Sequence, residues 1–304
     1  MSHSDLHFRI AGLPLRILFT DGSDARKLLN SYAPFYEPHP SDSPVMTVRF
    51  GSGLVSAEAT SAEVGQFDAG GCNHGVYRLP EGGHKIIISD VSGEKVCAMT
   101  MDQRGENVHV SPLTDTFIQQ EFGLNNAIMI AFAAMGAYNE TLLMHSSVAM
   151  VDGRGYMFLG TSGTGKSTHS DLWVRHIPGT EILNDDNPAV VLREGKAFVC
   201  GTPWSGKRDF YRQLTLPIGA IVRLEQAPEN SILREPALHA FASILSACST
   251  MIWDKENYER ICRTVEGIAM RVPIFHLKNR PDEEAARMSF GAATGSTNVE
   301  TRKF

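Results

Sequence analysis

A glycine-rich run in the middle of the chain has the residue types and spacing of a phosphate-binding loop. The run is Gly160-Thr161-Ser162-Gly163-Thr164-Gly165-Lys166-Ser167-Thr168, and it fits the pattern G-x-x-x-x-G-K-[ST]. Glycines at this spacing let the backbone turn tightly, so that its N–H groups and a following helix N-terminus attract phosphate oxygens. Lys166 supplies a positive charge for the β- and γ-phosphates, and the Ser167 hydroxyl is a magnesium ligand. We therefore expect residues 160–168 to bind a nucleoside triphosphate.

The segments around this run are the ones that such a loop needs. Tyr156 to Leu159 is a short apolar run typical of a strand, and the residues from Gly165 to about His176 suit a helix. A second apolar run, Leu142 to Val151, comes just before. The two runs are joined by Asp152-Gly153-Arg154-Gly155, and Asp-Gly between apolar runs is a strong hairpin signal. The sequence thus predicts a β-hairpin that leads directly into the loop.

Two adjacent carboxylates follow the loop. Asp185 and Asp186 come directly after Glu181 to Leu183 and Asn184, at the end of a predicted short strand. At this distance from a phosphate loop, one carboxylate can hold magnesium while the other acts on the nucleophile or on a second metal. Asp-Asp-Asn-Pro is also favourable turn chemistry, so an acidic turn is the alternative that these residues alone leave open.

A histidine and a second glycine-bearing loop complete the candidate residues. His145 lies on the predicted hairpin, where a lone histidine is as often a packing residue as a functional one. Gly201 to Arg208 contains Trp204, Lys207 and Arg208. A cation in this loop can neutralise a transferring phosphoryl group, and the aromatic ring can line a substrate pocket. A surface turn with solvated charges is the alternative.

Composition limits the class of protein. The chain has 304 residues, 42% of them hydrophobic and 20% charged, with a net charge of −6. This is typical of a globular protein and disfavours a nucleic-acid or anionic-membrane partner. Residues 1–5 lack the basic and apolar regions of a signal peptide, and we expect the most apolar long stretch, Phe122 to Tyr138, to be a buried helix and not a membrane span. The five cysteines form no Cys-x-x-Cys pair, which favours a reducing compartment, and we expect the cytoplasm.

The chain is expected to divide into two domains. Residues 1–112 contain short strand patterns separated by Gly, Asp and Ser, and they predict a smaller β-rich N-terminal domain without a chemical motif. Residues 113–290 begin with a long helical pattern from Asp115 to about Tyr138 and contain every candidate site residue. The small polar residues from 291 to 304 predict a disordered tail.

Four blocks of this sequence resemble the HPr kinase/phosphorylase and ATP-type phosphoenolpyruvate carboxykinase superfamily. They are, in order, Met144-His145-Ser146-Ser147, Gly160 to Thr168, Asp185-Asp186, and Gly201 to Lys207. The resemblance implies an α/β fold, with a mixed-sheet carboxykinase-like nucleotide-binding core in place of the all-parallel core of common phosphate-loop proteins. It also implies ATP and Mg²⁺ as cofactors, with a second divalent metal such as Mn²⁺.

The resemblance further implies a role for individual residues. Ser167, Asp185 and Asp186 serve the metal site, and the aspartates also activate the nucleophile by analogy with HPr kinase. His145 matches the carboxykinase histidine that binds a second metal. Lys207 falls where carboxykinases place a lysine on the γ-phosphate.

The leading hypothesis from the sequence is an ATP- and Mg-dependent kinase that transfers the γ-phosphoryl group to a hydroxyl on a protein, a peptide or a small molecule. The alternatives are a carboxykinase-like lyase and a non-catalytic, ATP-binding regulatory protein. The chain has Thr168 where HPr kinase has Glu, and it lacks both the arginine–glycine signature of that enzyme and the oxaloacetate-binding arginine segment of a carboxykinase. The sequence therefore leaves the acceptor open.

Overall fold

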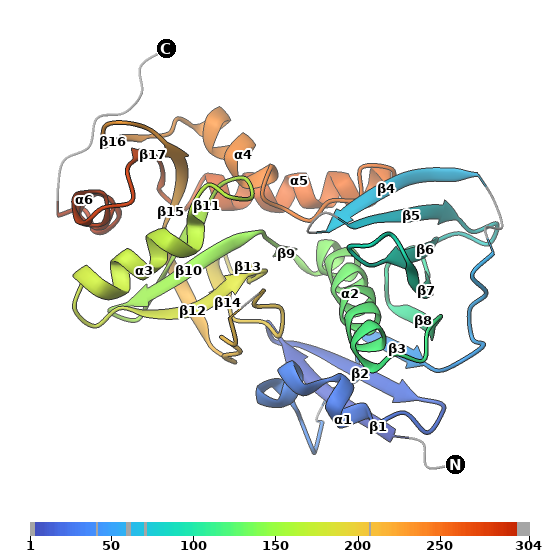
Figure 1. Ribbon diagram of the computed structural model, residues 1–304. Helices are drawn as coiled ribbons and strands as arrows, with labels where there is room; N and C mark the ends of the chain where they lie inside the picture. The colour runs from blue at the N-terminus through green and yellow to red at the C-terminus, as the bar shows by residue number, and fades with distance from the viewer. Residues whose placement is uncertain (1–3, 41, 59–61, 70–71, 207, 297–304) are drawn as a thin grey trace. The chain divides into compact units, whose positions relative to one another are not determined.

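The chain folds as a mixed α/β protein with two compact units (Figure 1). The computed structural model describes residues 4–40, 42–58, 62–69, 72–206 and 208–296. One unit comprises Met1–Asn139 with Met251–Asn257, and the other comprises Glu140–Thr250 with Tyr258–Phe304. The boundary expected at residue 112 lies before helix α2 (Phe117–Gly136), whereas the first unit includes that helix.

The described residues of the first unit form an eight-stranded mixed sheet in the order β1-β2-β3-β8-β7-β6-β5-β4. The pairs β2·β3 and β3·β8 are parallel and the others are antiparallel. The strands are β1 (Ser4–Ile10), β2 (Leu13–Phe19), β3 (Met46–Phe50), β4 (Glu63–Ala69), β5 (Cys72–Arg78), β6 (His84–Ser89), β7 (Lys95–Met101) and β8 (Asn107–Pro112). The β-rich N-terminal sheet expected from the sequence is therefore present, although β4 was not predicted.

Helix α2 covers this sheet with an apolar face. It packs on β3, β6, β7 and β8, and its buried side chains include Leu124, Ile128 and Phe132. Gly123 lets the helix approach β7 closely, because a Cβ there would lie 2.6 Å from the Cβ of Cys97. The unit also contains the short helix α1 (Ala25–Leu28) and the 3₁₀ segments η1 (Asn30–Phe35) and η2 (Ala137–Asn139). Asp24 caps α1 by accepting from the backbone N–H of Lys27.

A nine-stranded mixed sheet forms from the described residues of the second unit. Its main path is β12-β10-β11-β15-β14-β13-β9, and β17 pairs with both β15 and β16. The strands are β9 (Thr141–Leu143), β10 (Ser146–Val151), β11 (Arg154–Leu159), β12 (Glu181–Asp186), β13 (Ala189–Arg193), β14 (Lys196–Cys200), β15 (Thr215–Gln226), β16 (Ser231–Arg234) and β17 (Ile274–Asn279). Strand β15 pairs with β14 at its start and then runs parallel to β11 and β17.

The hairpin predicted before the phosphate loop is confirmed. Strands β10 and β11 pair antiparallel across Asp152 and Gly153, whose φ angles are 51° and 69°. Two successive positive φ angles give the turn a twist that matches the strands it joins. The strand expected over Leu142 to Val151 is interrupted, because the N–H groups of Met144 and His145 donate to the carbonyls of Pro188 and Ala247.

Helix α3 (Lys166–His176) is attached firmly to the sheet. Trp173 is fully buried, and its indole N–H donates to the hydroxyl of Ser289 over 2.8 Å. His169 Nε2 lies 2.9 Å from the same hydroxyl, and burial lowers the pKa of His169 to about 4. Ser289 belongs to α6 (Glu283–Thr294), which packs against α3. His169 and Trp173 therefore anchor α3, and with it the helix N-terminus next to the loop, to α6.

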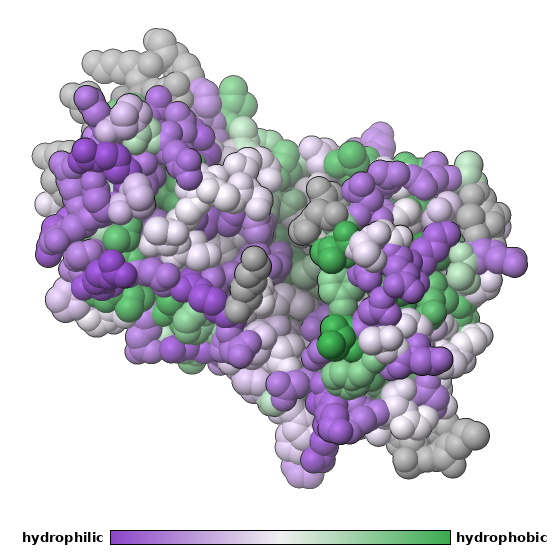
Figure 2. Space-filling view, in the orientation of Figure 1, coloured by the Kyte–Doolittle hydropathy of each residue, from purple (hydrophilic) through white to green (hydrophobic). Residues whose placement is uncertain are grey.

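The remaining helices are α4 (Ala237–Leu245) and α5 (Lys255–Ala269). The expectation of a disordered tail from residue 291 is wrong for its first residues, since α6 continues to Thr294 and buries Ala292. Residues 297–304 lie outside the described part. None of the helices in the described ranges combines the length and apolar character needed to cross a membrane. Hydrophilic side chains dominate the visible face of the second unit around α3 and β12 (Figure 2).

Candidate functional site

The glycine-rich run lies between the end of β11 and the start of α3, as predicted. Gly163 and Gly165 have φ angles of 80° and 101°, a left-handed conformation that favours glycine. Gly165 is the N-cap of α3, and no described side chain caps the helix. The N–H groups of its first turn therefore point toward the loop and are available to an anion.

Lys166 holds its ammonium group across the mouth of this loop. Its Nζ donates to the carbonyl oxygens of Gly160 and Thr161 over 2.9 and 3.3 Å, and it lies 2.9 Å from Nε2 of His145. Burial lowers the pKa of Lys166, while the carboxylates of Asp186 and Asp185 oppose this shift. The lysine predicted to bind phosphate is thus linked directly to the histidine predicted from the preceding hairpin.

His145 connects the loop to the acidic pair. Its Nδ1 lies 3.1 Å from Oδ1 of Asp186, on the side of the ring opposite to Lys166. A lysine ammonium on Nε2 and a carboxylate on Nδ1 assign the proton of the neutral ring to Nδ1. Strand pairing explains the proximity, because Ser146, the residue after His145, lies opposite Asp186 in the β10·β12 register.

Asp185 faces α3, on the other side of the sheet from Asp186. It lies opposite Ser147, whose hydroxyl is 2.8 Å from that of Ser170 on α3. The Ser170 hydroxyl in turn donates to the carbonyl of Ser167 over 2.9 Å. The alternation of side chains along a strand therefore puts the Asp185 carboxylate on the face that carries the start of α3.

The carboxylate of Asp185 is buried and only half satisfied. Its side chain is 5% exposed, and its Oδ2 accepts from Nε of Arg208. Arg208 also donates through Nη1 to Asp171 of α3. The other oxygen, Oδ1, is buried and has no hydrogen-bond partner among the described residues. A buried carboxylate oxygen without a partner is costly, and it marks a position for a cation.

The loop after β14 also reaches the acidic pair Asp185 and Asp186. Gly206 lies against the acidic pair, because a Cβ there would be 3.0 Å from the Cβ of Asp186. Lys207, predicted to contact the γ-phosphate, lies outside the described residues, and its neighbour Arg208 is the cation that touches Asp185. Trp204 is buried, and its carbonyl accepts from the N–H of Asn187. Trp204 does not line the cavity described below, and its role as the wall of a substrate pocket stays a prediction.

The predicted metal ligands fit magnesium by their chemistry. They are Ser167, Asp185, Asp186 and His145. In the part of the chain that the structure describes, no three His, Cys, Asp or Glu side chains form a complete metal cage. Magnesium does not require one, since it is usually held by one or two carboxylates together with phosphate oxygens and water. The unpartnered Oδ1 of Asp185 and the exposed Ser167 hydroxyl suit such a partial site.

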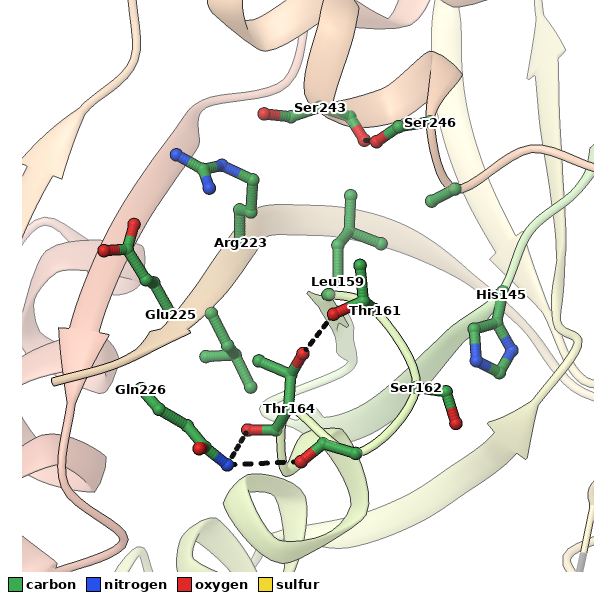
Figure 3. A pocket seen from close by; sticks show the side chains of 14 residues that line it. His145, Leu159, Thr161, Ser162, Thr164, Arg223, Glu225, Gln226, Ser243 and Ser246 are labelled. Atoms are coloured by element: carbon green, nitrogen blue, oxygen red, sulfur yellow. Dashed lines mark hydrogen bonds between the residues drawn. The ribbon is translucent and has the colours of Figure 1, made fainter.

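A cavity of about 610 Å³ adjoins the first half of the phosphate loop (Figure 3). The end of β15 forms one wall and the end of α4 another. The lining residues are His145, Leu159, Gly160, Thr161, Ser162, Gly163, Thr164, Arg223, Leu224, Glu225, Gln226, Ser243, Ser246 and Ala247. Those after Thr164 were not predicted from the sequence. The one signal for them is topological: carboxyl ends of parallel strands such as β11 and β15 open onto one edge, where ligands bind.

Comparisons with known proteins add a distant similarity of fold. No protein-family model matches the sequence, and no curated protein matches it. Among solved structures, the chain is similar to the Hpr(Ser) kinase/phosphatase from Coxiella burnetii, with 11% sequence identity and a TM-score of 0.32. The similarity covers 51% of this chain and 99% of that one. A TM-score at this level carries no argument about activity.

Proposed function

We propose that this chain is an ATP- and Mg²⁺-dependent phosphotransferase that moves the γ-phosphoryl group of ATP to a hydroxyl. The observation that carries the proposal is the link from Lys166 through His145 to Asp186, beside a phosphate loop and a half-satisfied Asp185. Phosphoryl transfer needs a phosphate cradle, a cation, a metal site and a group that accepts or orients the hydroxyl proton. These residues, which lie together at one sheet edge, have the chemistry for each of these parts, and this supports the proposal.

Each side chain has a distinct part in this proposal. The first-turn N–H groups of α3 and the Lys166 ammonium bind the phosphates. Ser167 and Asp185 would hold a magnesium ion, which would supply positive charge to the β- and γ-phosphates. Asp186 accepts the proton of the acceptor hydroxyl, and the N–H of His145 fixes the orientation of that carboxylate. Positioning and electrostatic stabilisation provide most of the rate in this chemistry.

The test is transfer of labelled phosphate from ATP. Wild-type protein is incubated with γ-labelled ATP and Mg²⁺, with and without a panel of hydroxyl compounds and serine peptides. We expect acceptor-dependent transfer and slow transfer to water, both reduced at least about 100-fold in Asp186→Asn. Glu181→Gln is the matched control, because Glu181 lies on the same strand but is exposed and paired with Arg212.

The same experiment separates the proposal from its rivals. Wild-type protein that binds ATP but transfers phosphate neither to water nor to any acceptor contradicts a phosphotransferase and supports an ATP-binding regulatory protein. Phosphoenolpyruvate formed from oxaloacetate and ATP would instead identify a lyase. Lys166→Met should lose ATP binding in all three cases, so it serves as the control for the nucleotide site itself.

A further inference from the structure

The 610 Å³ cavity lies at the N-terminal end of the phosphate loop. It is lined by Gly160 to Thr164 and by His145, whereas the residues of the first turn of α3 do not line it. The Lys166 ammonium is held at the same end, by Gly160, Thr161 and His145. Because the lysine of such a loop contacts the β- and γ-phosphates, the cavity begins where the transferred group of a bound ATP would end.

Arg223 of β15 is the cation in the lining of this cavity, and a buried carboxylate fixes the orientation of its side chain. Its Nε donates to Oε1 of Glu235 over 3.0 Å. Glu235 is 1% exposed, and its Oε2 accepts from the hydroxyl of Ser243 over 2.7 Å. Both oxygens of the buried carboxylate are therefore satisfied, and the guanidinium group cannot turn away without breaking this arrangement.

The terminal nitrogens of Arg223 remain available. The side chain is 30% exposed and lines the cavity, and no described residue accepts from its Nη1 or Nη2. An arginine whose Nε is held in this way presents its Nη groups as a fixed fork, the geometry that suits a carboxylate or a phosphate.

The rest of the lining suits a small polar molecule. Leu159, Leu224 and Ala247 provide apolar contact, while Ser243 and Ser246 lie along the wall formed by α4 (Figure 3). The one carboxylate in the lining, Glu225, is 3.5 Å from Nζ of Lys278 and 2.8 Å from Nε2 of His276, whose pKa is lowered by burial. Lys278 is therefore the group that carries a positive charge beside Glu225 at neutral pH, and it compensates part of the carboxylate charge that an anion at Arg223 would meet.

We infer that this cavity receives the phosphoryl acceptor, and that the acceptor is a small hydroxyl compound whose carboxylate or phosphate group binds Arg223. The inference rests on the proposed function. In the transfer, the acceptor oxygen bonds to the γ-phosphorus of ATP, the bond from that phosphorus to the bridging β-oxygen breaks, and ADP leaves. The hydroxyl proton passes to Asp186.

The experiment uses pairs of probes that differ in the anionic group. Glycerate is compared with glyceramide, and glycerol 3-phosphate with glycerol, by calorimetry on full-length protein saturated with Mg²⁺ and a non-hydrolysable ATP analogue. We expect the anionic member of at least one pair to bind about tenfold tighter or more, and the pair that shows it distinguishes a carboxylate from a phosphate. Arg223→Met should abolish this preference without changing the affinity for the ATP analogue.

Two further variants keep the result interpretable. The double variant Arg223→Met, Glu235→Gln removes the buried carboxylate charge that Arg223→Met leaves without its partner, so loss of preference in a folded double variant still tests the cavity. Arg212→Met is the matched control, since Arg212 lies on the same unit but pairs with the exposed Glu181. It should leave the preference unchanged.

Each outcome has a definite consequence. Equal binding of charged and neutral probes, or binding of neither, by protein that binds the ATP analogue overturns the inference and leaves the proposed function standing. Weaker binding of the analogue in Arg223→Met assigns the cavity to the nucleotide instead and also overturns it. Wild-type protein that fails to bind the analogue contradicts the proposed function itself.

Discussion

Two arginine–carboxylate pairs lie on either side of the phosphate loop, and their carboxylates are completed differently. On the β12 side, Arg208 donates to one oxygen of Asp185, and the other oxygen is buried without a partner in the described structure. On the β15 side, Arg223 donates to one oxygen of Glu235 and Ser243 donates to the other. Both carboxylates are almost fully buried.

This difference indicates which carboxylate supports the fold and which is available to a ligand. A buried polar network with every member satisfied makes its surroundings rigid. A network with one missing partner is less stable as it stands, and a bound cation stabilises it. We therefore assign Glu235 to holding Arg223 in place, and we propose that Asp185 binds the metal of the proposed transfer reaction.

The largest expected effect is that of Asp185→Asn on turnover. If Asp185 is a magnesium ligand, as the proposed function requires, phosphate release or transfer should fall at least about 100-fold when its carboxylate is removed. The free energy of unfolding should change by less than about 1 kcal/mol, because Arg208 keeps Asp171 as a partner. Single-turnover assays and urea unfolding measure the two quantities. A variant that unfolds readily yet turns over normally when folded would reverse the assignment.

Glu235→Gln should lower the free energy of unfolding and leave turnover nearly unchanged. It leaves Arg223 without its counter-charge, and we expect a loss of about 2 kcal/mol of unfolding free energy, below the range for fully buried pairs because Arg223 is partly exposed. Transfer of phosphate to water should stay within a few-fold of wild type. Urea unfolding is the measurement. Glu229→Gln, at an exposed position on the same unit, should change stability by less than about 0.5 kcal/mol.

Ser243→Ala tests the comparison of the two carboxylates by removing one hydrogen bond, the one that Ser243 donates to Glu235. It gives Glu235 the same unpartnered oxygen that Asp185 has, and it should cost about 1.5 kcal/mol of unfolding free energy. Ser246→Ala is the neighbouring control, because its hydroxyl donates to a backbone carbonyl instead of to Glu235. Equal losses for the two variants in urea unfolding would show that the buried carboxylate does not depend on its second partner.

The smallest expected effect is on the pH dependence of ATP affinity. Burial lowers the pKa of Lys166, so its ammonium loses its proton at a lower pH than an ordinary lysine. Affinity should be full below that lowered pKa and should fall above it by at most about tenfold per pH unit. Asp185 raises this pKa, so Asp185→Asn should move the decline to lower pH, whereas Glu235→Gln should not. Calorimetry from neutral to alkaline pH measures both shifts.

The parts of the site that were predictable from sequence are those that local patterns encode. The phosphate loop, the Asp152–Gly153 turn and helix α3 each follow from residues adjacent in the chain. The acidic pair was predicted by its distance from the loop. The interruption at Met144 and His145 was not, because its backbone partners lie at Pro188 and Ala247.

The cavity was missed for the same reason. Arg223, Glu235 and Ser243 have no motif, and each is far from the loop in sequence. They reach it only because β15 pairs in parallel with β11 and because α4 follows close behind. Pairing between distant strands depends on the whole fold, so no window of neighbouring residues contains it.

The pairings of strand β15 determine when the site forms during folding. Its pairing with β11 places Ile218 opposite Gly155, and its pairing with β17 places Ile221 opposite Ile274. Each pairing therefore closes a long loop of chain. Closing long loops costs entropy before any contact repays it, and folds rich in such pairings form slowly. The loop and hairpin can form early, but the cavity with Arg223 is complete only when these late pairings close. A nucleotide that binds only the finished protein would then increase the yield of folding by mass action.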